Sequence, residues 1–218
     1  MSEYLAQKHA LYAQVGRLSR ALGQQTRLEI IEILAQAPRS VETIASLLQT
    51  DIRSVSQHLQ VLVECGLLTV ERKGRFRWYA VRCQEVLQLA VLLRTTEILL
   101  GAPQTDVKDE LTLSEGLSLA QQGKLQLIDV RPLEEFQSGH LAGALSMPLA
   151  SLSETITKLD SETPAAAYCR SPYCFLARQA QEIFAKHGKT LYVLSDGVQD
   201  WKASSPELLT ISTDSEES

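Results

Sequence analysis

The hydrophobic pattern of the chain changes type partway along, and a polar stretch containing Gly and Pro separates the two patterns. Up to Leu100, apolar residues recur mainly at steps of three and four, which is typical of amphipathic helices. Beyond the polar stretch, short apolar runs alternate with helical segments, which predicts strands separated by helices. With 218 residues, the chain is long enough for two cores. We predict domains over residues 1–100 and 111–206, a linker over 101–110 and an acidic tail over 207–218.

Composition narrows the class of protein. A hydrophobic content of 44% with 22% charged residues excludes a disordered, collagen-like or coiled-coil chain. No apolar run approaches the roughly 18 residues that a membrane span needs, and the segment from Met1 to Leu11 lacks the pattern of a signal peptide. We therefore expect a cytoplasmic protein with no membrane partner. The four cysteines are too few for a disulfide framework, so we expect them to be thiols in a reducing compartment.

Charge is divided unevenly between the two regions. Residues 1–100 hold 12 Lys and Arg against 9 Asp and Glu, a net charge of +3, whereas residues 101–218 hold 9 against 17, a net charge of −8. This asymmetry predicts that the two regions meet different partners.

The first region is predicted to be mainly helical with one hairpin. Apolar residues at helical spacing mark the segments Leu5 to Leu22, Leu28 to Leu34, Val41 to Leu48, Ile52 to Glu64 and Gln84 to Leu100. Alternating patterns over 68–72 and 75–81, joined by Lys73-Gly74, predict a β-hairpin. The last helix carries more apolar surface than a small domain can bury, which predicts a helix partner from a second subunit.

Two helices joined by a tight turn and followed by a basic hairpin form a winged helix-turn-helix layout, in which the second helix can lie in the major groove of DNA. On the polar face of the segment Ile52 to Glu64, we predict that Arg53 and Gln57 read bases, because Arg suits guanine and Gln suits adenine. Ser54 and His58 lie beside them, and Ser56 is predicted to contact phosphate.

The predicted hairpin tip carries four cations that can neutralise phosphates without reading bases. These cations are Arg72, Lys73, Arg75 and Arg77. The alternative is that the polar helix face and the charged hairpin are simply solvated.

Residues 17–82 resemble the ArsR/SmtB family of winged-helix repressors. The resemblance lies in the stretches Leu22–Ile31, Val55–Leu62, Cys65–Leu68 and Gly74–Tyr79. It implies a homodimer that binds double-stranded operator DNA, dimerises through the helices before Gly23 and after Cys83, and releases DNA when an inducer binds. Two metal-site positions of the family lack thiolate and imidazole here, so we expect no metal and no cofactor. Cys65 and Cys83 are interpreted as apolar fillers near helix ends, with a role as ligands or sensing thiols as the alternative.

In the second region, a cysteine follows a predicted strand and opens a predicted helix. The strands cover Leu125–Val130, Ala165–Tyr168 and Leu191–Leu194, and the helix runs from Phe175 to His187. Backbone N–H groups and the helix dipole at such a junction lower the pKa of a thiol, and Arg170 adds positive charge. This context favours a reactive Cys169 with Cys174 as a second thiol nearby.

Residues 111–204 resemble the rhodanese domain through Leu127–Arg131 with Glu134–Phe136, Gly139–Ala144, the Cys169 loop and Ser195–Trp201. The resemblance implies an α/β domain with a central parallel sheet, in which Cys169 accepts a sulfane sulfur as a persulfide. It also implies a structural role for His140. The six-residue loop is the length that the family associates with sulfur substrates, but Cys174 stands where the family commonly has Arg. A second thiol there can resolve a persulfide on Cys169, which is sensor chemistry.

The complete hypothesis is a mainly α winged helix-turn-helix repressor fused to an α/β rhodanese domain that acts as its input. A reactive sulfur species or a low-molecular-weight thiol persulfide modifies Cys169, and operator affinity falls. One alternative is a sulfurtransferase enzyme with an autoregulatory DNA-binding domain. Another is an arsenite-responsive repressor that uses Cys169 and Cys174. The leading hypothesis requires that a reagent can reach Cys169.

Overall fold

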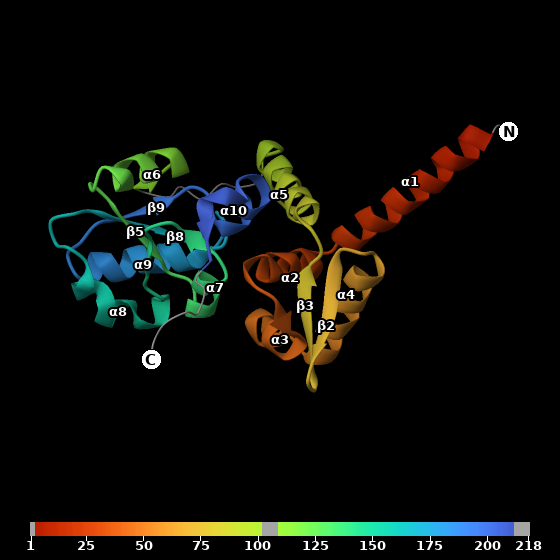
Figure 1. Ribbon diagram of the computed structural model, residues 1–218, viewed down its shortest axis with the longest axis horizontal. Helices are drawn as coiled ribbons and strands as arrows, with labels where there is room; N and C mark the ends of the chain where they lie inside the picture. The colour runs from red at the N-terminus through yellow and green to blue at the C-terminus, as the bar shows by residue number, and fades with distance from the viewer. Residues whose placement is uncertain (1–2, 102–108, 212–218) are drawn as a thin grey trace. The chain divides into compact units, whose positions relative to one another are not determined.

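The computed structural model describes residues 3–101 and 109–211 (Figure 1). The chain divides into two compact units, Met1–Leu92 and Leu93–Ser218. This division falls inside helix α5 (Gln84–Leu99), upstream of the linker that we predicted over 101–110. Most of that linker, 102–108, and the end of the predicted tail, 212–218, lie outside the described residues.

The first unit contains a three-stranded antiparallel sheet in the order β1-β3-β2 among its helices. Its strands are β1 (Arg39–Ser40), β2 (Leu68–Lys73) and β3 (Phe76–Val81). The helices are α1 (Glu3–Leu22), α2 (Gln25–Gln36), α3 (Val41–Leu48), α4 (Ile52–Glu64) and the first part of α5. The predicted helices and the hairpin are therefore present in this winged helix-turn-helix fold.

Local sequence explains where these helices begin. The side chains of Gln24, Ser40 and Asp51 accept hydrogen bonds from backbone N–H groups in the first turns of α2, α3 and α4. Strand β1 was not predicted, because two residues are too short to show an alternating pattern. It pairs with β3 and places the chain between α2 and α3 at the sheet edge.

Two helices of this region present large apolar side chains to solvent. On α1 these are Tyr4, Leu11, Tyr12 and Val15, and around the end of α5 they are Leu92, Leu93, Leu99 and Leu100. The whole surface of α1 from Glu3 to Arg20 is exposed or half-buried, so this helix packs on its own unit only near its C-terminal end.

The second unit is built on a five-stranded parallel sheet in the order β4-β9-β8-β5-β7. Its strands are β4 (Glu110–Leu111), β5 (Gln126–Asp129), β7 (Leu145–Ser146), β8 (Ala165–Tyr168) and β9 (Leu191–Leu194). A separate antiparallel pair joins β6 (His140–Leu141) to β10 (Leu209–Thr210). The predicted central parallel sheet is confirmed, although the two-residue edge strands were not predicted.

Helices cover both faces of this sheet, as a parallel sheet requires. They are α6 (Leu113–Gln121), α7 (Leu133–Gln137), α8 (Leu152–Thr155), α9 (Phe175–Lys186) and α10 (Val198–Ser204), with 3₁₀ turns η1 (Leu149–Ser151), η2 (Ile156–Lys158) and η3 (Pro206–Leu208). Alternate residues of β8 face opposite cores: Ala165 and Ala167 pack toward α9, whereas Ala166 and Tyr168 pack toward α10. Among the described helices, none has the length and apolar character of a membrane span.

A fully buried ion pair lies where β5 ends. Arg131 Nη2 lies 2.6 Å from Asp129 Oδ2 and donates a further 2.7 Å hydrogen bond to the Gly139 carbonyl. Both charged side chains are inaccessible to solvent. Removal of one partner would leave the other charge buried and unpaired, which is far more costly than loss of a surface pair.

We expect Arg131→Met to lower the free energy of unfolding by about 3–5 kcal/mol, because Asp129 keeps no compensating charge. Chemical denaturation measures the change. Lys124→Met, at an exposed position, is the matched control and should change stability by less than about 0.5 kcal/mol. Equal stability of the two variants would contradict this assignment.

Candidate functional site

Helix α4 exposes the polar face that we predicted to read DNA. Val55, Leu59 and Leu62 are fully buried and fix α4 against α2 and α3. On the opposite face, side chains able to read bases are exposed or half-buried. Arg53, Ser56 and Gln57 are exposed, and Ser54 and His58 are half-buried.

The hydroxyl of Ser56 is already engaged within the helix. Its Oγ donates a 2.7 Å hydrogen bond to the carbonyl of Ile52. A hydroxyl has one donor hydrogen, so a phosphate contact would require Ser56 to rotate away from this carbonyl. The expected phosphate contact therefore gains no support from this geometry.

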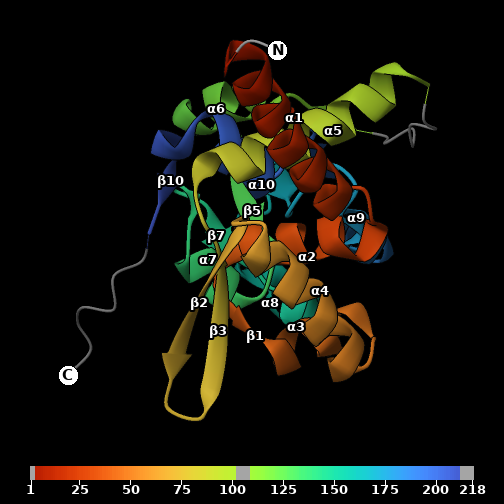
Figure 2. The same cartoon turned by 90° about the vertical axis from the view of Figure 1, so that its right-hand side faces the viewer.

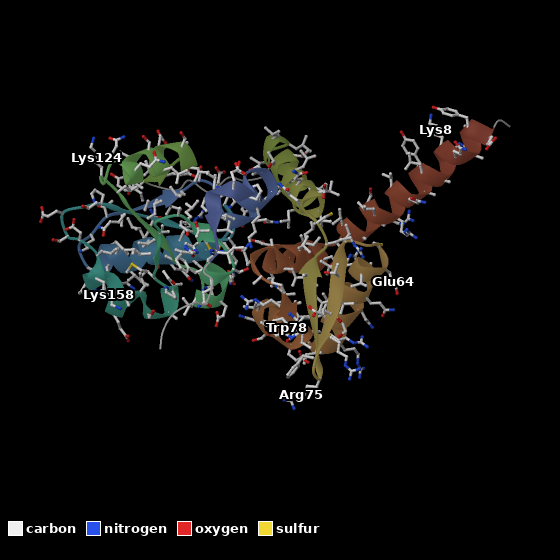
Figure 3. The ribbon with its side chains drawn as sticks, in the orientation of Figure 1. Lys8, Glu64, Arg75, Trp78, Lys124 and Lys158 are labelled. Carbon is white, nitrogen blue, oxygen red and sulfur yellow. A yellow bond between two sulfur atoms is a disulfide. The ribbon has the colours of Figure 1, made fainter. Side chains whose placement is uncertain are left out.

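The hairpin of β2 and β3 extends beyond the helices of its unit and carries exposed cations (Figure 2). Gly74, with a φ of +64°, begins the turn, and Arg75 stands at the tip (Figure 3). Arg72 and Arg77 lie directly opposite each other in the strand register. Like charges in such a pair repel, so a bound phosphate would relieve a cost that the free protein carries. Lys73 is partly neutralised by Glu71, whose Oε2 lies 3.3 Å from its Nζ.

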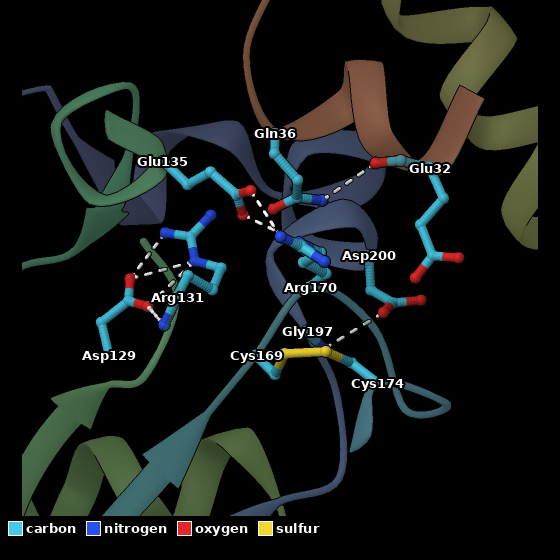
Figure 4. The surroundings of a disulfide bond; sticks show 10 residues. All are labelled: Glu32, Gln36, Asp129, Arg131, Glu135, Cys169, Arg170, Cys174, Gly197 and Asp200. Atoms are coloured by element: carbon cyan, nitrogen blue, oxygen red, sulfur yellow. Dashed lines mark hydrogen bonds and ion pairs between the residues drawn. A yellow bond between two sulfur atoms is a disulfide. The ribbon is translucent and has the colours of Figure 1, made fainter. Parts of the chain in front are cut away.

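The loop between β8 and α9 holds Cys169 and Cys174, and a disulfide joins them with their Cα atoms 6.1 Å apart (Figure 4). The expectation that all four cysteines are thiols is therefore wrong for this pair. Cys65 and Cys83 are free, half-buried and exposed respectively. A bridge between close residues of one loop needs no disulfide framework, so the low cysteine count did not exclude it.

The two sulfur positions differ in exposure and in their relation to α9. Cys169 continues the side of β8 that packs toward α9 and is only 3% exposed, whereas Cys174 is half-buried. Cys174, not Cys169, is the N-cap residue of α9, and the field of the helix dipole is strongest within the first turn. Both cysteines line a pocket together with Ser171, Pro172 and Arg178.

The backbone of the cysteine loop is held by the first turn of α10. The carbonyl of Cys169 accepts a 3.1 Å hydrogen bond from Val198 N–H, and the carbonyl of Arg170 accepts a 2.9 Å bond from Gln199 N–H. Gly197 lies so close that a Cβ on it would come within 2.4 Å of Ser171 N. Because these contacts involve backbone atoms, a side chain at position 197 could be accommodated only if the backbone of the loop shifted.

Arg170 does not direct its charge toward the disulfide. Its guanidinium binds the Glu135 carboxylate through Nε and Nη2, at 2.9 and 2.7 Å, and Glu135 is buried (Figure 4). The positive charge that we expected to favour a thiolate is thus balanced by a carboxylate. Glu135 was not singled out from the sequence, because its helix and the Arg170 loop lie 35 positions apart in the chain.

A half-buried lysine, Lys202, lies close to these ion pairs. Burial and the nearby charge of Arg131 lower the pKa of Lys202 to about 8, and Glu135 acts in the opposite direction.

His140 is buried, stacks on Phe136 with ring centroids 3.7 Å apart, and shares a 2.9 Å hydrogen bond between its Nδ1 and the Phe136 carbonyl. These contacts fit the structural role that we expected for His140. Within 3–101 and 109–211, no cluster of three or more His, Cys, Asp or Glu side chains could hold a metal ion.

Comparison with known proteins identifies both units. A model described as a helix-turn-helix domain matches residues 22–71, and one described as a rhodanese-like domain matches residues 112–204. The HTH-type transcriptional regulator Rv0324 of Mycobacterium tuberculosis is 33% identical over 207 residues, which cover 89% of this chain and 90% of that protein. The chain belongs to the ArsR/SmtB family of HTH-type transcriptional regulators. It is a DNA-binding regulator with a C-terminal rhodanese domain, as both resemblances implied.

Two further similarities concern one unit each. The thiosulfate sulfurtransferase GlpE of Coxiella burnetii is 32% identical over 94 residues, which cover 42% of this regulator and 85% of that protein. The homodimeric winged helix-turn-helix domain Mb0332 of Mycobacterium bovis, a possible ArsR-family regulator solved as the fragment 1–100, is 30% identical. That likeness covers 49% of this regulator and 95% of that chain, with a TM-score of 0.43.

Two arginine variants should separate base reading from phosphate binding in this regulator. We expect Arg53→Ala to lower the preference for operator over a scrambled duplex by about 1–3 kcal/mol. Arg75→Ala should weaken both duplexes alike and lower the slope of log affinity against log salt by about 1. Fluorescence anisotropy titrations at several salt concentrations measure both effects, with Lys124→Ala as the control. Unchanged operator preference in Arg53→Ala would remove Arg53 from the reading face.

A glycine variant tests how tightly the cysteine loop is held. We expect Gly197→Ala to lower the free energy of unfolding by roughly 1–3 kcal/mol, because the added methyl group overlaps the backbone of Ser171. Gly116→Ala is a useful comparison, since its Cβ would meet only the movable end of the Leu194 side chain. A larger loss of stability in Gly116→Ala than in Gly197→Ala would contradict the backbone argument.

Proposed function

We propose that this regulator is a homodimeric repressor whose affinity for operator DNA falls when a reactive sulfur species joins Cys169 to Cys174. The observation that carries the proposal is the disulfide within the loop between β8 and α9. Two cysteines at the carboxyl end of a central parallel strand, beside a pocket, are suited to a reversible reaction with a small molecule. The DNA-binding unit then supplies the output.

The chemistry needs only a persulfide of general form RSSH. The Cys169 thiolate attacks the terminal, sulfane sulfur of RSSH, which breaks the S–S bond, forms a Cys169 persulfide and releases the thiol RSH. The Cys174 thiolate then attacks Sγ of Cys169, which closes the disulfide and expels the sulfane sulfur as hydrosulfide. Each step exchanges one S–S bond for another. The two cysteines lose two electrons to the sulfane sulfur, so no other oxidant is required.

The burial of Cys169 restricts which reagents can take part. Cys169 has only 3% of its surface exposed, and it lines a small pocket together with Cys174. A small persulfide fits this requirement better than a large oxidant. Cys174 is the more exposed residue of the two, so a reductant that opens the bridge meets Cys174 first.

Exposed apolar side chains support the dimer. Tyr12 on α1 is 63% exposed, and Leu99 at the end of α5 is 81% exposed. These are the helices that the family resemblance assigns to dimerisation. Burial of such side chains against a second copy would stabilise the dimer by roughly 1.5–3 kcal/mol for each fully covered large residue.

We expect Cys169→Ser and Cys174→Ser to bind operator DNA like the reduced wild-type protein and to retain that affinity after treatment with a low-molecular-weight persulfide. In the wild-type protein, the same treatment should weaken binding by roughly 5- to 150-fold, the usual range of coupling between two sites. Intact-mass analysis should find the disulfide in the wild type and in neither the Cys169→Ser nor the Cys174→Ser protein. Cys83→Ser, which removes an exposed free thiol, is the control and should respond normally. A Cys169→Ser protein that remains inducible would refute the proposal.

A sulfurtransferase function is the second candidate, because a relative of the second unit is named a thiosulfate sulfurtransferase. With cyanide as the sulfur acceptor, an enzyme would form many thiocyanate ions per protein chain and release sulfite from thiosulfate or the thiol RSH from RSSH, whereas a sensor would stop after one modification per site. Measurement of turnover over hours distinguishes the two. For the arsenite alternative, reduction would supply two thiolates, but the described residues place no third His, Cys, Asp or Glu ligand beside them.

A further inference from the structure

One arginine on α5 binds the helix that holds the cysteine loop. Arg94 Nη1 donates a 3.1 Å hydrogen bond to Gln199 Oε1, and its Nη2 forms an ion pair with Asp200 Oδ1. Arg94 and Asp200 belong to the same unit of the chain, and their side chains are only 17% and 15% exposed. A charged pair shielded in this way is screened less by salt than a surface pair and resists separation.

The residues that Arg94 contacts are also those that support the cysteine loop. Asp200 uses its second oxygen, Oδ2, to accept a 3.1 Å hydrogen bond from Gly197 N–H, where α10 begins (Figure 4). Gln199 donates its own N–H to the carbonyl of Arg170, one residue after Cys169. The Gln199 contact therefore reaches the loop through one further hydrogen bond, and the Asp200 contact reaches Gly197, which packs against the backbone of the loop.

These bonds form a continuous connection from the disulfide to α5. The steps are the peptide of Cys169 and Arg170, the first turn of α10, the side chains of Gln199 and Asp200, and the guanidinium of Arg94. Its first step is rigid, because Gly197 touches loop backbone rather than a flexible side chain. A shift of the loop when the disulfide opens or closes must either break these bonds or move the first turn of α10.

We propose that Arg94 is a positioning residue that couples the redox state of the Cys169–Cys174 loop to the orientation of α5. This inference rests on the proposed function, since it needs a disulfide that forms and opens in response to a signal. Helix α5 is a suitable receiver because Leu92, Leu93 and Leu99 on or near its second half are exposed and available to a second subunit. A change in the position of α5 would then alter how two DNA-binding units are spaced, and operator affinity is sensitive to that spacing.

The test compares operator affinity of the reduced and the disulfide forms in Arg94→Gln and in the wild-type protein. Glutamine removes the positive charge and the pair of guanidinium nitrogens that bind Gln199 and Asp200, but it is compatible with a helix. We expect reduced Arg94→Gln to bind operator like the reduced wild type, and its affinity ratio between the two forms to fall toward one. Glu97→Gln, an exposed change one turn further along α5, is the matched control and should keep the wild-type ratio.

A second variant approaches the same contact from α10. Asn at position 200 can still accept the hydrogen bond from Gly197 N–H but carries no charge for Arg94. We expect Asp200→Asn to lower the ratio of operator affinities between the reduced and the disulfide forms, as Arg94→Gln does. The double variant should give the same ratio as either single variant, because both changes remove the same interaction. Arg94→Lys keeps a charge but cannot bind Gln199 and Asp200 together as a planar fork, and it should give an intermediate ratio. Circular dichroism of each variant checks that it is folded.

The outcomes separate this inference from the function on which it rests. If the wild-type protein binds operator equally in both redox forms, the proposed function fails and the coupling fails with it. If the wild type responds and both Arg94→Gln and Asp200→Asn keep its ratio, the role of Arg94 is refuted while the proposed function stands. In a redox buffer, operator DNA should also shift the equilibrium of the loop from the disulfide toward the two thiols in the wild type and not in Arg94→Gln. The same result in both proteins would argue against the coupling, because affinity coupling between two sites is reciprocal.

Discussion

The backbone contact between the cysteine loop and the start of α10 is the constraint on which the site depends. Gly197 permits the loop to lie against α10 at a distance that excludes even a methyl group, and two backbone hydrogen bonds continue the contact. Interiors packed in this way move between discrete arrangements rather than deforming gradually. A loop held by backbone atoms is therefore able to transmit a change at its sulfur atoms, because no flexible side chain can absorb the shift.

Much of the fold was predictable because its signals are local. The buried side of α4 appears in the sequence as Val55, Leu59 and Leu62, and the cap at Asp51 appears as a residue type at the right place. Strand β8 appears as the apolar run Ala165–Tyr168 before the cysteine. The short strands at the sheet edges were missed, since two residues carry too little pattern, and each owes its conformation to the strand beside it rather than to its own sequence.

The candidate site was predictable in its residues but not in its connections. Spacing and family resemblance brought Cys169, Arg170 and Cys174 together, and the structure places them in one loop. The partner of Arg170 is Glu135, and the partner of Asp200 is Arg94, which lies 106 positions away in the chain. Pairing over such distances depends on how the elements pack, and no local pattern records it. By contrast, the start of α9 at Phe175 was predicted from local pattern, and it makes Cys174 rather than Cys169 the N-cap residue.

The exposure of the two sulfur atoms gives the proposed reaction a direction. An incoming thiol reductant can approach Cys174 more readily than Cys169, because Cys174 is half-buried while Cys169 is buried in the apolar core. Attack on Sγ of Cys174 makes Cys169 the leaving thiolate, which is then already positioned for the next persulfide. A second thiol finally attacks the mixed disulfide and frees Cys174. Burial of Cys169 thus favours an ordered cycle, in which the outer cysteine exchanges with cellular thiols and the inner one accepts sulfane sulfur.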